Sequence, residues 1–341
     1  MKKTLLVTGA SGFIATHTII EMLNHGYKVR GTVRCMDGTA QDRTEAIRAM
    51  LKPHTAHIDQ LEFVAATLDE AECWDAAVSG CDAILHIASP VPIKQPKNPD
   101  EIITPAREGT LHVLRAAQRA GIRLFIITSS EEAVSQRDDA TARPLTDKDW
   151  SDPNRHNISA YALSKTLSEK AAWDFAKAND LDLTSINPVL VLGPALEKDY
   201  GTSLETLVSL MSGKYPLIPK LGFSIVDVRD VASLHRIALE SPASIGQRLL
   251  CSSEFRWFID ISKELIEQFP SYKRKLPTRS LPNFVVRLLA PFDPIIAFIV
   301  DSLEKRVEFD CSPAKALGWT PRSSREAISA GALSLIDLGL V

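Results

Sequence analysis

Short apolar runs alternate with longer segments of helical periodicity through the first half of the chain. The apolar runs predict strands at 4–8, 28–33, 61–65, 83–87, 124–128 and 183–187. The segments between them predict helices at 12–25, 42–52, 70–79, 100–120 and 158–179. Strands separated by helices need crossover connections, which build a parallel sheet covered by helices on both faces. The pattern therefore predicts an α/β fold with a doubly wound parallel sheet.

The alternation weakens after about residue 193. Helices are predicted at 202–212, 230–240 and 257–268, and short strands near 224–228 and 248–251. Proline also becomes more frequent beyond residue 215. We therefore expect residues 1–192 to form the core, with 224–255 contributing to it, and residues 193–341 to form mainly a smaller, less regular substrate-capping region.

Charge and cysteine usage narrow the class of protein. The 341 residues include 42 acids and 39 bases, a formal net charge of −3, so no nucleic-acid partner is expected. The segment 281–303 is apolar, but its charged residues and three prolines exclude an uninterrupted membrane-spanning helix, so no membrane partner is expected. Five cysteines without metal-ligand spacing predict reduced thiols, no metal site and a cytoplasmic location.

A glycine-containing loop follows the first predicted strand and opens the first predicted helix. Gly9 and Gly12 are arranged as G-x-x-G-x-x-A, with Ala15 in place of a third glycine. Glycines at such a turn let the backbone approach a pyrophosphate, whose charge the helix N-terminus favours. An ordinary tight turn would also explain two glycines. Their position at the first strand-to-helix turn of an alternating chain favours a dinucleotide-binding loop.

The end of the second predicted strand bears on the choice of cofactor. NAD enzymes place an acid there for the ribose hydroxyls, whereas this strand ends on Val33 and Arg34. A guanidinium is suited to the 2′-phosphate of NADP. The sequence therefore favours NADP over NAD. Asp37 is close enough to this strand end to leave NAD as an alternative cofactor. The alternative interpretation of Arg34 is that it is a solvated loop residue.

A tyrosine and a lysine are spaced for chemistry on the helix predicted at 158–179. Tyr161 and Lys165 are four residues apart, which places both on one face. A protonated lysine beside a phenol is expected to lower the phenol's pKa, making the tyrosine an acid and base for a carbonyl oxygen. Y-x-x-x-K also occurs on ordinary surface helices. It gains weight from Ser129 and Ser130, because hydroxyls at the end of a parallel strand point into the ligand crevice.

These motifs together resemble the extended short-chain dehydrogenases/reductases, within them the branch of dihydroflavonol reductases, cinnamoyl-CoA reductases and yeast-type aldehyde/ketone reductases. The matching segments are TGASGFIA at 8–15, VR at 33–34, HIASP at 86–90, TSS at 128–130, YALSKTLSEKAAW at 161–173, NPVLVLGP at 187–194, DVRDVA at 227–232 and LGW at 317–319. The resemblance covers nearly the whole chain. It implies a Rossmann-like core and an NADPH-dependent oxidoreductase, a monomer or homodimer, that reduces the aldehyde or ketone of a small hydrophobic substrate.

The resemblance also implies a role for each matching residue. Ser130 would position the substrate carbonyl, Tyr161 would be the proton donor, and Lys165 would hold the nicotinamide ribose. The other implied cofactor contacts are Gly9, Gly12, Phe13 and Ile14 at the pyrophosphate, Arg34 at the 2′-phosphate, Leu68 near the adenine, Ile87, Ala88 and Ser89 beneath the cofactor, and Pro188 and Val191 at the nicotinamide.

The chain departs from the family's pattern at several of these sites. Thr67 replaces the usual aspartate near the adenine, and Ala106 replaces the fourth catalytic asparagine of the classical relatives. His112 replaces another asparagine, and is interpreted as a helix-surface or supporting residue rather than a catalytic one. Glu131 and Glu132 directly follow the catalytic serine, where reductases have small residues.

Two alternative functions follow from these features. Sugar-nucleotide epimerases and dehydratases, which retain NAD, place an acidic pair after their catalytic hydroxyl, and Glu131-Glu132 resembles that pair. Ala133 and Val134 are one residue out of register with the dehydratase pattern. The other alternative is a non-catalytic NADP-binding regulator, against which the presence of all three catalytic residues argues.

Overall fold

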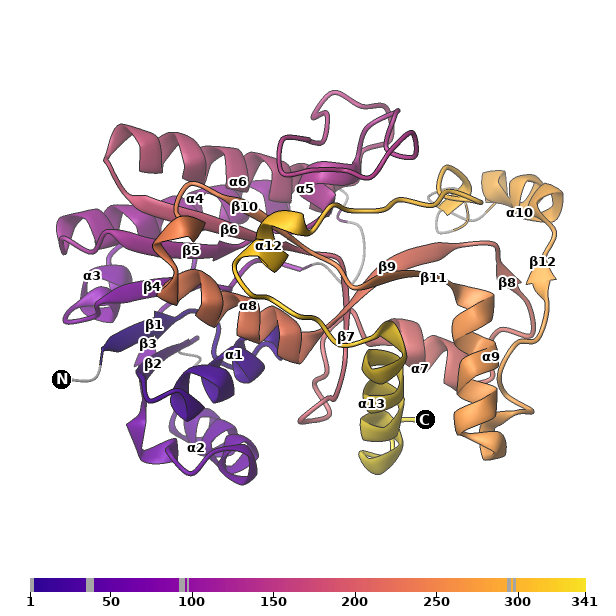
Figure 1. The fold of residues 1–341 in the computed structure, drawn as a ribbon, viewed down its shortest axis with the longest axis horizontal. Helices are drawn as coiled ribbons and strands as arrows, with labels where there is room; N and C mark the ends of the chain where they lie inside the picture. Colours follow the sequence, from indigo (N-terminus) through magenta and orange to yellow (C-terminus); the bar gives the residue numbers. More distant parts are fainter. Residues whose placement is uncertain (1–2, 35–39, 92–95, 97, 293–295, 297–298) are drawn as a thin grey trace.

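A seven-stranded parallel sheet forms the centre of the computed structural model (Figure 1), in the order β10-β6-β5-β4-β1-β2-β3. The structure describes residues 3–34, 40–91, 96, 98–292, 296 and 299–341. The seven strands are β1 (Thr4–Val7), β2 (Lys28–Val33), β3 (Leu61–Ala65), β4 (Ala83–His86), β5 (Leu124–Thr128), β6 (Asp182–Pro188) and β10 (Arg248–Cys251). Every neighbouring pair in this sheet is parallel. The predicted Rossmann-like α/β fold is therefore confirmed.

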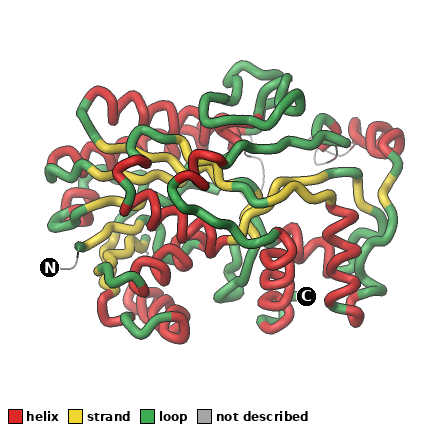
Figure 2. Tube along the Cα trace, in the orientation of Figure 1, coloured by secondary structure: helices red, strands yellow, loops and turns green. Residues whose placement is uncertain are grey.

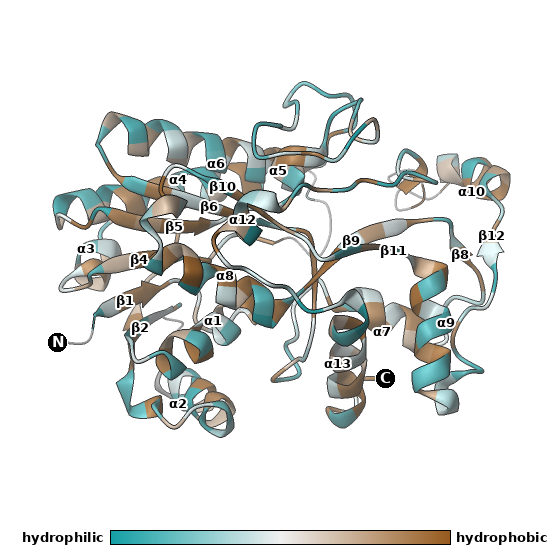
Figure 3. Cartoon of the chain, viewed as in Figure 1, coloured by the Kyte–Doolittle hydropathy of each residue, from teal (hydrophilic) through white to brown (hydrophobic). Residues whose placement is uncertain are grey.

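Helices cover both faces of this sheet. One face packs against α1 (Phe13–Asn24), α2 (Ala40–Leu51) and α8 (Val228–Glu240). The other packs against α3 (Cys73–Val78), α4 (Asp100–Arg119) and α6 (Ala160–Ala178). The strands β4 and β5 are mainly apolar, as Figure 3 shows, because a sheet covered on both faces has no solvated side.

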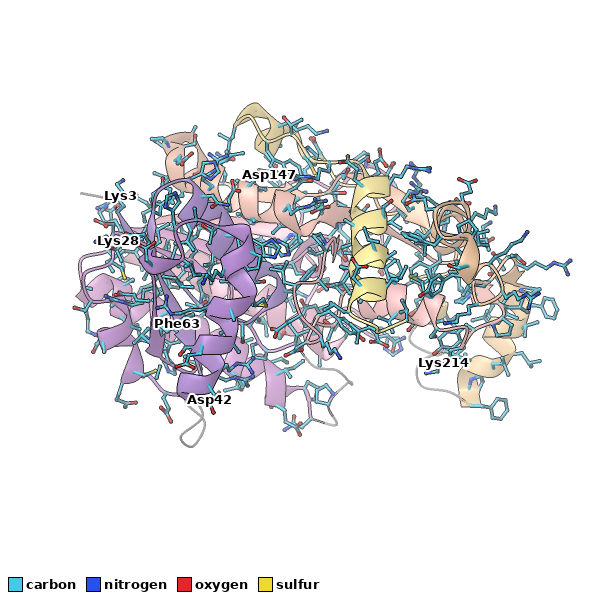
Figure 4. All side chains as sticks on the ribbon, turned by 90° about the horizontal axis from the view of Figure 1, so that it is seen from below. Lys3, Lys28, Asp42, Phe63, Asp147 and Lys214 are labelled. Atoms are coloured by element: carbon cyan, nitrogen blue, oxygen red, sulfur yellow. The ribbon has the colours of Figure 1, made fainter. Side chains whose placement is uncertain are left out.

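The later part of the chain forms a second, smaller sheet with the order β11-β9-β7. Its strands are β7 (Leu190–Leu192), β9 (Gly222–Asp227) and β11 (Glu254–Trp257). They share a hydrophobic core with α7 (Glu205–Met211), α9 (Phe258–Gln268) and α13 (Ser324–Asp337). In Figure 4 the labelled Phe63 on β3 lies in the part of the molecule built on the large sheet, and Lys214 beyond α7 lies in the part that holds the small sheet.

Short elements complete the described chain. They are α5 (Glu132–Ser135), α10 (Asn283–Leu289), α12 (Ser312–Ala316), the strand pair β8 (Ile218–Pro219) and β12 (Ser280–Leu281), and the 3₁₀ turns Lys52–His54, Ile58–Gln60, Pro242–Ser244, Pro270–Tyr272 and Ala290–Phe292. A long loop from α5 to α6 lies at the top of Figure 2. Among the described residues, no helix has the length and apolar character needed to cross a bilayer.

The predicted elements of the first half are confirmed to within a few residues at each end. In the second half, the strand predicted near 248–251 joins the large sheet as β10, whereas the one near 224–228 lies in the small sheet as β9. The helix α13 was not predicted. The division of the chain into a core and a substrate-capping region stays a prediction.

Candidate active site

The sequence motifs meet along one edge of the large sheet. Because all its strands are parallel, the residues that follow them share the carboxyl edge, where open α/β sheets bind ligands. The strand order β3-β2-β1-β4-β5-β6 arranges them along that edge as Leu68, Arg34, Gly9, the segment 87–89, Ser130 and Pro188. This order suits an extended dinucleotide, with adenine contacts at one end and nicotinamide contacts at the other.

The loop after β1 is shaped to receive a phosphate. Gly9 has a φ of +71°, and a Cβ built on it would lie 3.1 Å from the Cβ of Ala88. Gly12 is the N-cap of α1 and donates its own N–H to the carbonyl of Gly9 at 2.8 Å. As a glycine, Gly12 has no side chain with which to cap this end of α1, so the first N–H groups of the helix are left for an anion. Phe13 and Ile14 are partly exposed beside it.

The loop after β4 is held against this glycine loop by a buried hydroxyl. Thr8 Oγ1 accepts the N–H groups of Ile87 and Ala88, each at 2.9 Å. The same hydroxyl contacts Nδ1 of buried His86 at 3.0 Å. The predicted neighbours Ile87, Ala88 and Ser89 are thereby brought beside the pyrophosphate loop, and all three stay partly exposed.

The predicted adenine end is only partly described. Arg34 is exposed directly after β2, whereas Asp37 and Cys35 lie outside the described residues. Leu68 is half-buried, and Nδ1 of His112 contacts its carbonyl oxygen at 3.0 Å. This contact agrees with the interpretation of His112 as a supporting residue rather than a catalytic one. Thr67 uses its carbonyl to accept the indole N–H of Trp74 at 3.1 Å.

The tyrosine and the lysine lie at the start of α6. Ser159 caps this helix by accepting the N–H of Ala162 at 3.0 Å, which places Tyr161 in the first turn. The predicted shared face is confirmed, because Lys165 Nζ lies 5.8 Å from the centre of the Tyr161 ring. Lys165 is buried and also donates to the last carbonyl of β5 at 3.5 Å. Burial lowers the pKa of Lys165 to about 8.

The Ser130 hydroxyl lies beside the phenol of Tyr161 and acts to lower its pKa. Ser130 Oγ accepts the N–H of Glu132 at 3.2 Å. The expectation of a lowered pKa for Tyr161 is wrong for this structure. Burial, followed by the charge of Glu132, raises the pKa of Tyr161 above its ordinary value. The phenol therefore stays protonated, which is the form a proton donor needs.

The acidic pair after Ser130 is packed beside the tyrosine rather than solvated. Glu131 accepts a hydrogen bond from Ser135 at 2.5 Å, and Glu132 accepts one from Gln136 at 2.9 Å. Burial raises the pKa of both, and the neighbouring Glu131 contributes to raising that of Glu132 to about 8. At neutral pH Glu132 is thus mostly a neutral acid.

Pro188, the last residue of β6, and Val191, just beyond it, are both buried. Pro188 accepts the N–H of Glu131 at 3.0 Å, so it lies against the segment that follows Ser130. Val191 belongs to β7 of the small sheet. The position predicted for the nicotinamide is therefore where the two sheets meet.

Sequence reasoning placed Ser129 in the crevice, and this is wrong. Its hydroxyl turns inward and donates to the buried carboxylate of Glu169 at 2.6 Å. Glu169 was not predicted as part of the site. A signal for it existed, because it continues the four-residue spacing of Tyr161 and Lys165 along α6.

A doubly wound sheet with a phosphate loop and a Ser–Tyr–Lys cluster on one edge defines a dinucleotide-dependent oxidoreductase. The chain belongs to the NAD dependent epimerase/dehydratase family, whose model matches residues 5–250.

Curated relatives narrow this class to reductases. The chain is 33% identical over 347 residues to tetraketide alpha-pyrone reductase 1 of Arabidopsis thaliana, covering 99% of this chain and 97% of the relative. It is 34% identical over 287 residues to cinnamoyl-CoA reductase 1 of the same plant, covering 81% and 77%. The resemblance to extended short-chain reductases is confirmed, and the chain is an enzyme of that type rather than a non-catalytic regulator.

Solved structures agree with the fold and with the cofactor. Yeast methylglyoxal/isovaleraldehyde reductase Gre2 complexed with NADPH superimposes with a TM-score of 0.80 at 25% identity, covering 99% of this chain and 100% of that one. Candida albicans Gre2 in complex with NADPH gives 0.79 at 27%, covering 98% and 99%. These structures agree with the prediction of NADP over NAD.

Proposed function

We propose that this enzyme uses NADPH to reduce the aldehyde or ketone of a small hydrophobic compound to the alcohol. The relatives named above act, by their names, on an alpha-pyrone and on a cinnamoyl thioester, and a third, 34% identical over 286 residues, on a dihydroflavonol. An aromatic or conjugated carbonyl compound is therefore the substrate class we favour. A cytoplasmic location and a monomer or homodimer belong to the same proposal.

NADPH, when bound, supplies the hydride for the carbonyl carbon. Tyr161 gives its proton to the carbonyl oxygen, so that the C=O bond becomes C–H and O–H. Ser130, whose hydroxyl lies beside the phenol, orients the same oxygen. Lys165, beside the phenol, would hold the ribose of the cofactor and would stabilise the phenolate that remains.

The observation that carries this proposal is the position of Lys165 Nζ 5.8 Å from the centre of the Tyr161 ring on one face of α6, with the Ser130 hydroxyl beside the phenol. The test is to mix the purified protein with NADPH and a panel of carbonyl compounds, including cinnamaldehydes, aromatic ketones and isovaleraldehyde. We expect loss of the nicotinamide absorbance with conjugated or aromatic members of the panel. No loss with any member would contradict the proposal.

The epimerase or dehydratase alternative rests on the half-buried acidic pair beside Tyr161. Such an enzyme regenerates its cofactor in each cycle, so the dinucleotide would purify with the protein and survive dialysis. A reductase must release NADP⁺ after each turnover. Cofactor that remains bound through dialysis would therefore favour the alternative.

We expect Arg34→Ala to lower the preference for NADPH over NADH by at least about tenfold, since a charge-assisted contact to the 2′-phosphate contributes about 1.5–3 kcal/mol. The measurement is kcat/KM for both cofactors with one carbonyl substrate. The internal control is NADH, whose kcat/KM should be nearly unchanged. An unaltered preference for NADPH over NADH would show that Arg34 does not contact the 2′-phosphate.

A further inference from the structure

A buried carboxylate lies one helical turn beyond the catalytic lysine. Tyr161, Lys165 and Glu169 follow one another at intervals of four residues on α6, so they share one face. Glu169 is 1% exposed and has no access to bulk solvent. A carboxylate in such a place is stable only if hydrogen bonds and an opposite charge replace its water.

Four neutral groups donate hydrogen bonds to this carboxylate. Oε2 accepts from the hydroxyl of Ser129 at 2.6 Å and from the amide of Asn187 at 2.8 Å. Oε1 accepts from the hydroxyl of Ser185 at 3.0 Å and from the indole of Trp173 at 3.2 Å. The donors come from the end of β5, from β6 and from α6 itself.

The opposite charge comes from the edge strand β10. Arg248 Nε donates to Oε1 of Glu169 at 2.7 Å, and Arg248 is itself buried. Its Nη1 donates to the carbonyls of Asp147 and Asp149 at 2.7 and 2.6 Å. The guanidinium carbon lies 3.6 Å from the ring centre of Trp150. The arginine therefore joins the loop between α5 and α6 to the inner face of the catalytic helix.

This network determines where the end of β5 lies relative to α6. Glu169 holds the side chain of Ser129, and Asn187, which also bonds Glu169, donates to the carbonyl of Ser130 at 3.1 Å. Lys165 holds the last carbonyl of β5 at 3.5 Å. Thr128 and Ser129 are thus bonded directly to side chains of α6. Ser130 is linked to the same helix through the amide of Asn187.

The network also has an electrostatic effect on the lysine. Burial raises the pKa of Glu169, but the charge and hydrogen bonds of Arg248 outweigh it, and the net pKa lies below the ordinary value. Glu169 is therefore ionised at neutral pH. Burial lowers the pKa of Lys165, and the charge of Glu169 opposes that effect.

We propose that Glu169, held by Arg248, is a positioning residue for the reductase reaction proposed above. It fixes the strand end that carries Ser130 against the face of α6 that carries the tyrosine and the lysine. Its negative charge also keeps that lysine protonated in the working range of pH.

The test compares Glu169→Gln with the double variant E169Q/R248M. The single variant leaves the charge of Arg248 buried without a partner, so its Tm falls. The double variant removes both charges and regains part of that loss. Should the single variant not fold, the double variant alone carries the test.

In both variants we expect kcat at neutral pH to fall about 10- to 100-fold. We also expect the alkaline limit of activity and of NADPH binding to move about one pH unit downward, because Lys165 loses its proton more readily without the nearby carboxylate. A purely structural role predicts that the double variant recovers kcat and both pH profiles together with its Tm. That recovery would overturn the proposal.

The matched control is Ser185→Ala, which removes one hydrogen bond from Glu169 and keeps its charge. Its Tm should fall while the alkaline limit stays in place. An equal shift of that limit in Ser185→Ala would contradict the role of the charge. NADPH binding is measured by the quenching of protein fluorescence. This measurement distinguishes a failure of the present proposal from a failure of the proposed function. If the wild-type enzyme reduces no carbonyl, the binding profile still decides whether Glu169 acts on Lys165.

Discussion

Tyr161→Phe is expected to lower kcat for carbonyl reduction by about 10²–10⁴-fold, since it removes the general acid and leaves the ring in place. NADPH binding should change little, because Lys165 keeps its charge and its bond to the end of β5. The measurement is steady-state kcat with the best carbonyl substrate, together with NADPH titration of the same sample.

A control for this variant is Tyr200→Phe, which removes an exposed tyrosine hydroxyl that donates to Glu205 at 2.7 Å. Its kcat should match that of the wild-type enzyme. Wild-type turnover by Tyr161→Phe would show that another group protonates the product. Glu132, neutral at pH 7 because burial and Glu131 raise its pKa to about 8, would then be the next candidate.

Gly9→Ala should weaken NADPH binding by at least about tenfold. The φ of Gly9 is +71°, which costs an L-residue about 1–2 kcal/mol. The new Cβ would also lie 3.1 Å from the Cβ of Ala88 and push apart the two loops that meet at the pyrophosphate. The measurement is the Kd for NADPH by fluorescence, with Tm as a second readout.

Gly26→Ala is the matched control, because Gly26 also has a positive φ, +86°, but has no atom within 4 Å of a built Cβ. It reports the conformational cost alone. Both variants should lose Tm, and only Gly9→Ala should lose NADPH affinity. Equal NADPH affinities in the two variants would show that the loop after β1 is not part of the cofactor site.

The main sheet could be predicted because its strands carry a local signal. Each buried strand is a short apolar run bounded by turn residues, and each helix shows its own periodicity. The candidate site followed from the same pattern, because the residues after parallel strands must share one edge. Gly9 and Ser130 could be assigned to that edge in this way, and Tyr161 was found by its four-residue spacing from Lys165.

Features that depend on distant parts of the chain were not predicted. Ser129 turns away from the crevice because Glu169, 40 residues later, accepts its hydroxyl. The partner of Glu169 is Arg248, 79 residues further on. No periodicity in the sequence links three such positions.

The raised pKa of Tyr161 was missed for a similar physical reason. The sequence shows the lysine four residues away, but not the burial of the phenol or the closeness of Glu132 and Glu131. Desolvation and these carboxyls outweigh the lysine. By contrast, α13 had a local signal that was overlooked, a capping box in which Ser323 and Glu326 bond each other's backbone N–H.

The most direct test of the account is the fate of the transferred hydrogen. NADPH in which deuterium replaces both hydrogens of the hydride-donating carbon is mixed with the enzyme and the carbonyl compound that consumes NADPH fastest. The account predicts an alcohol with one deuterium on the former carbonyl carbon, formed in equal amount to NADP⁺. A product without deuterium, or a product formed while the NADPH remains reduced, would contradict hydride transfer from NADPH as the reaction of this enzyme.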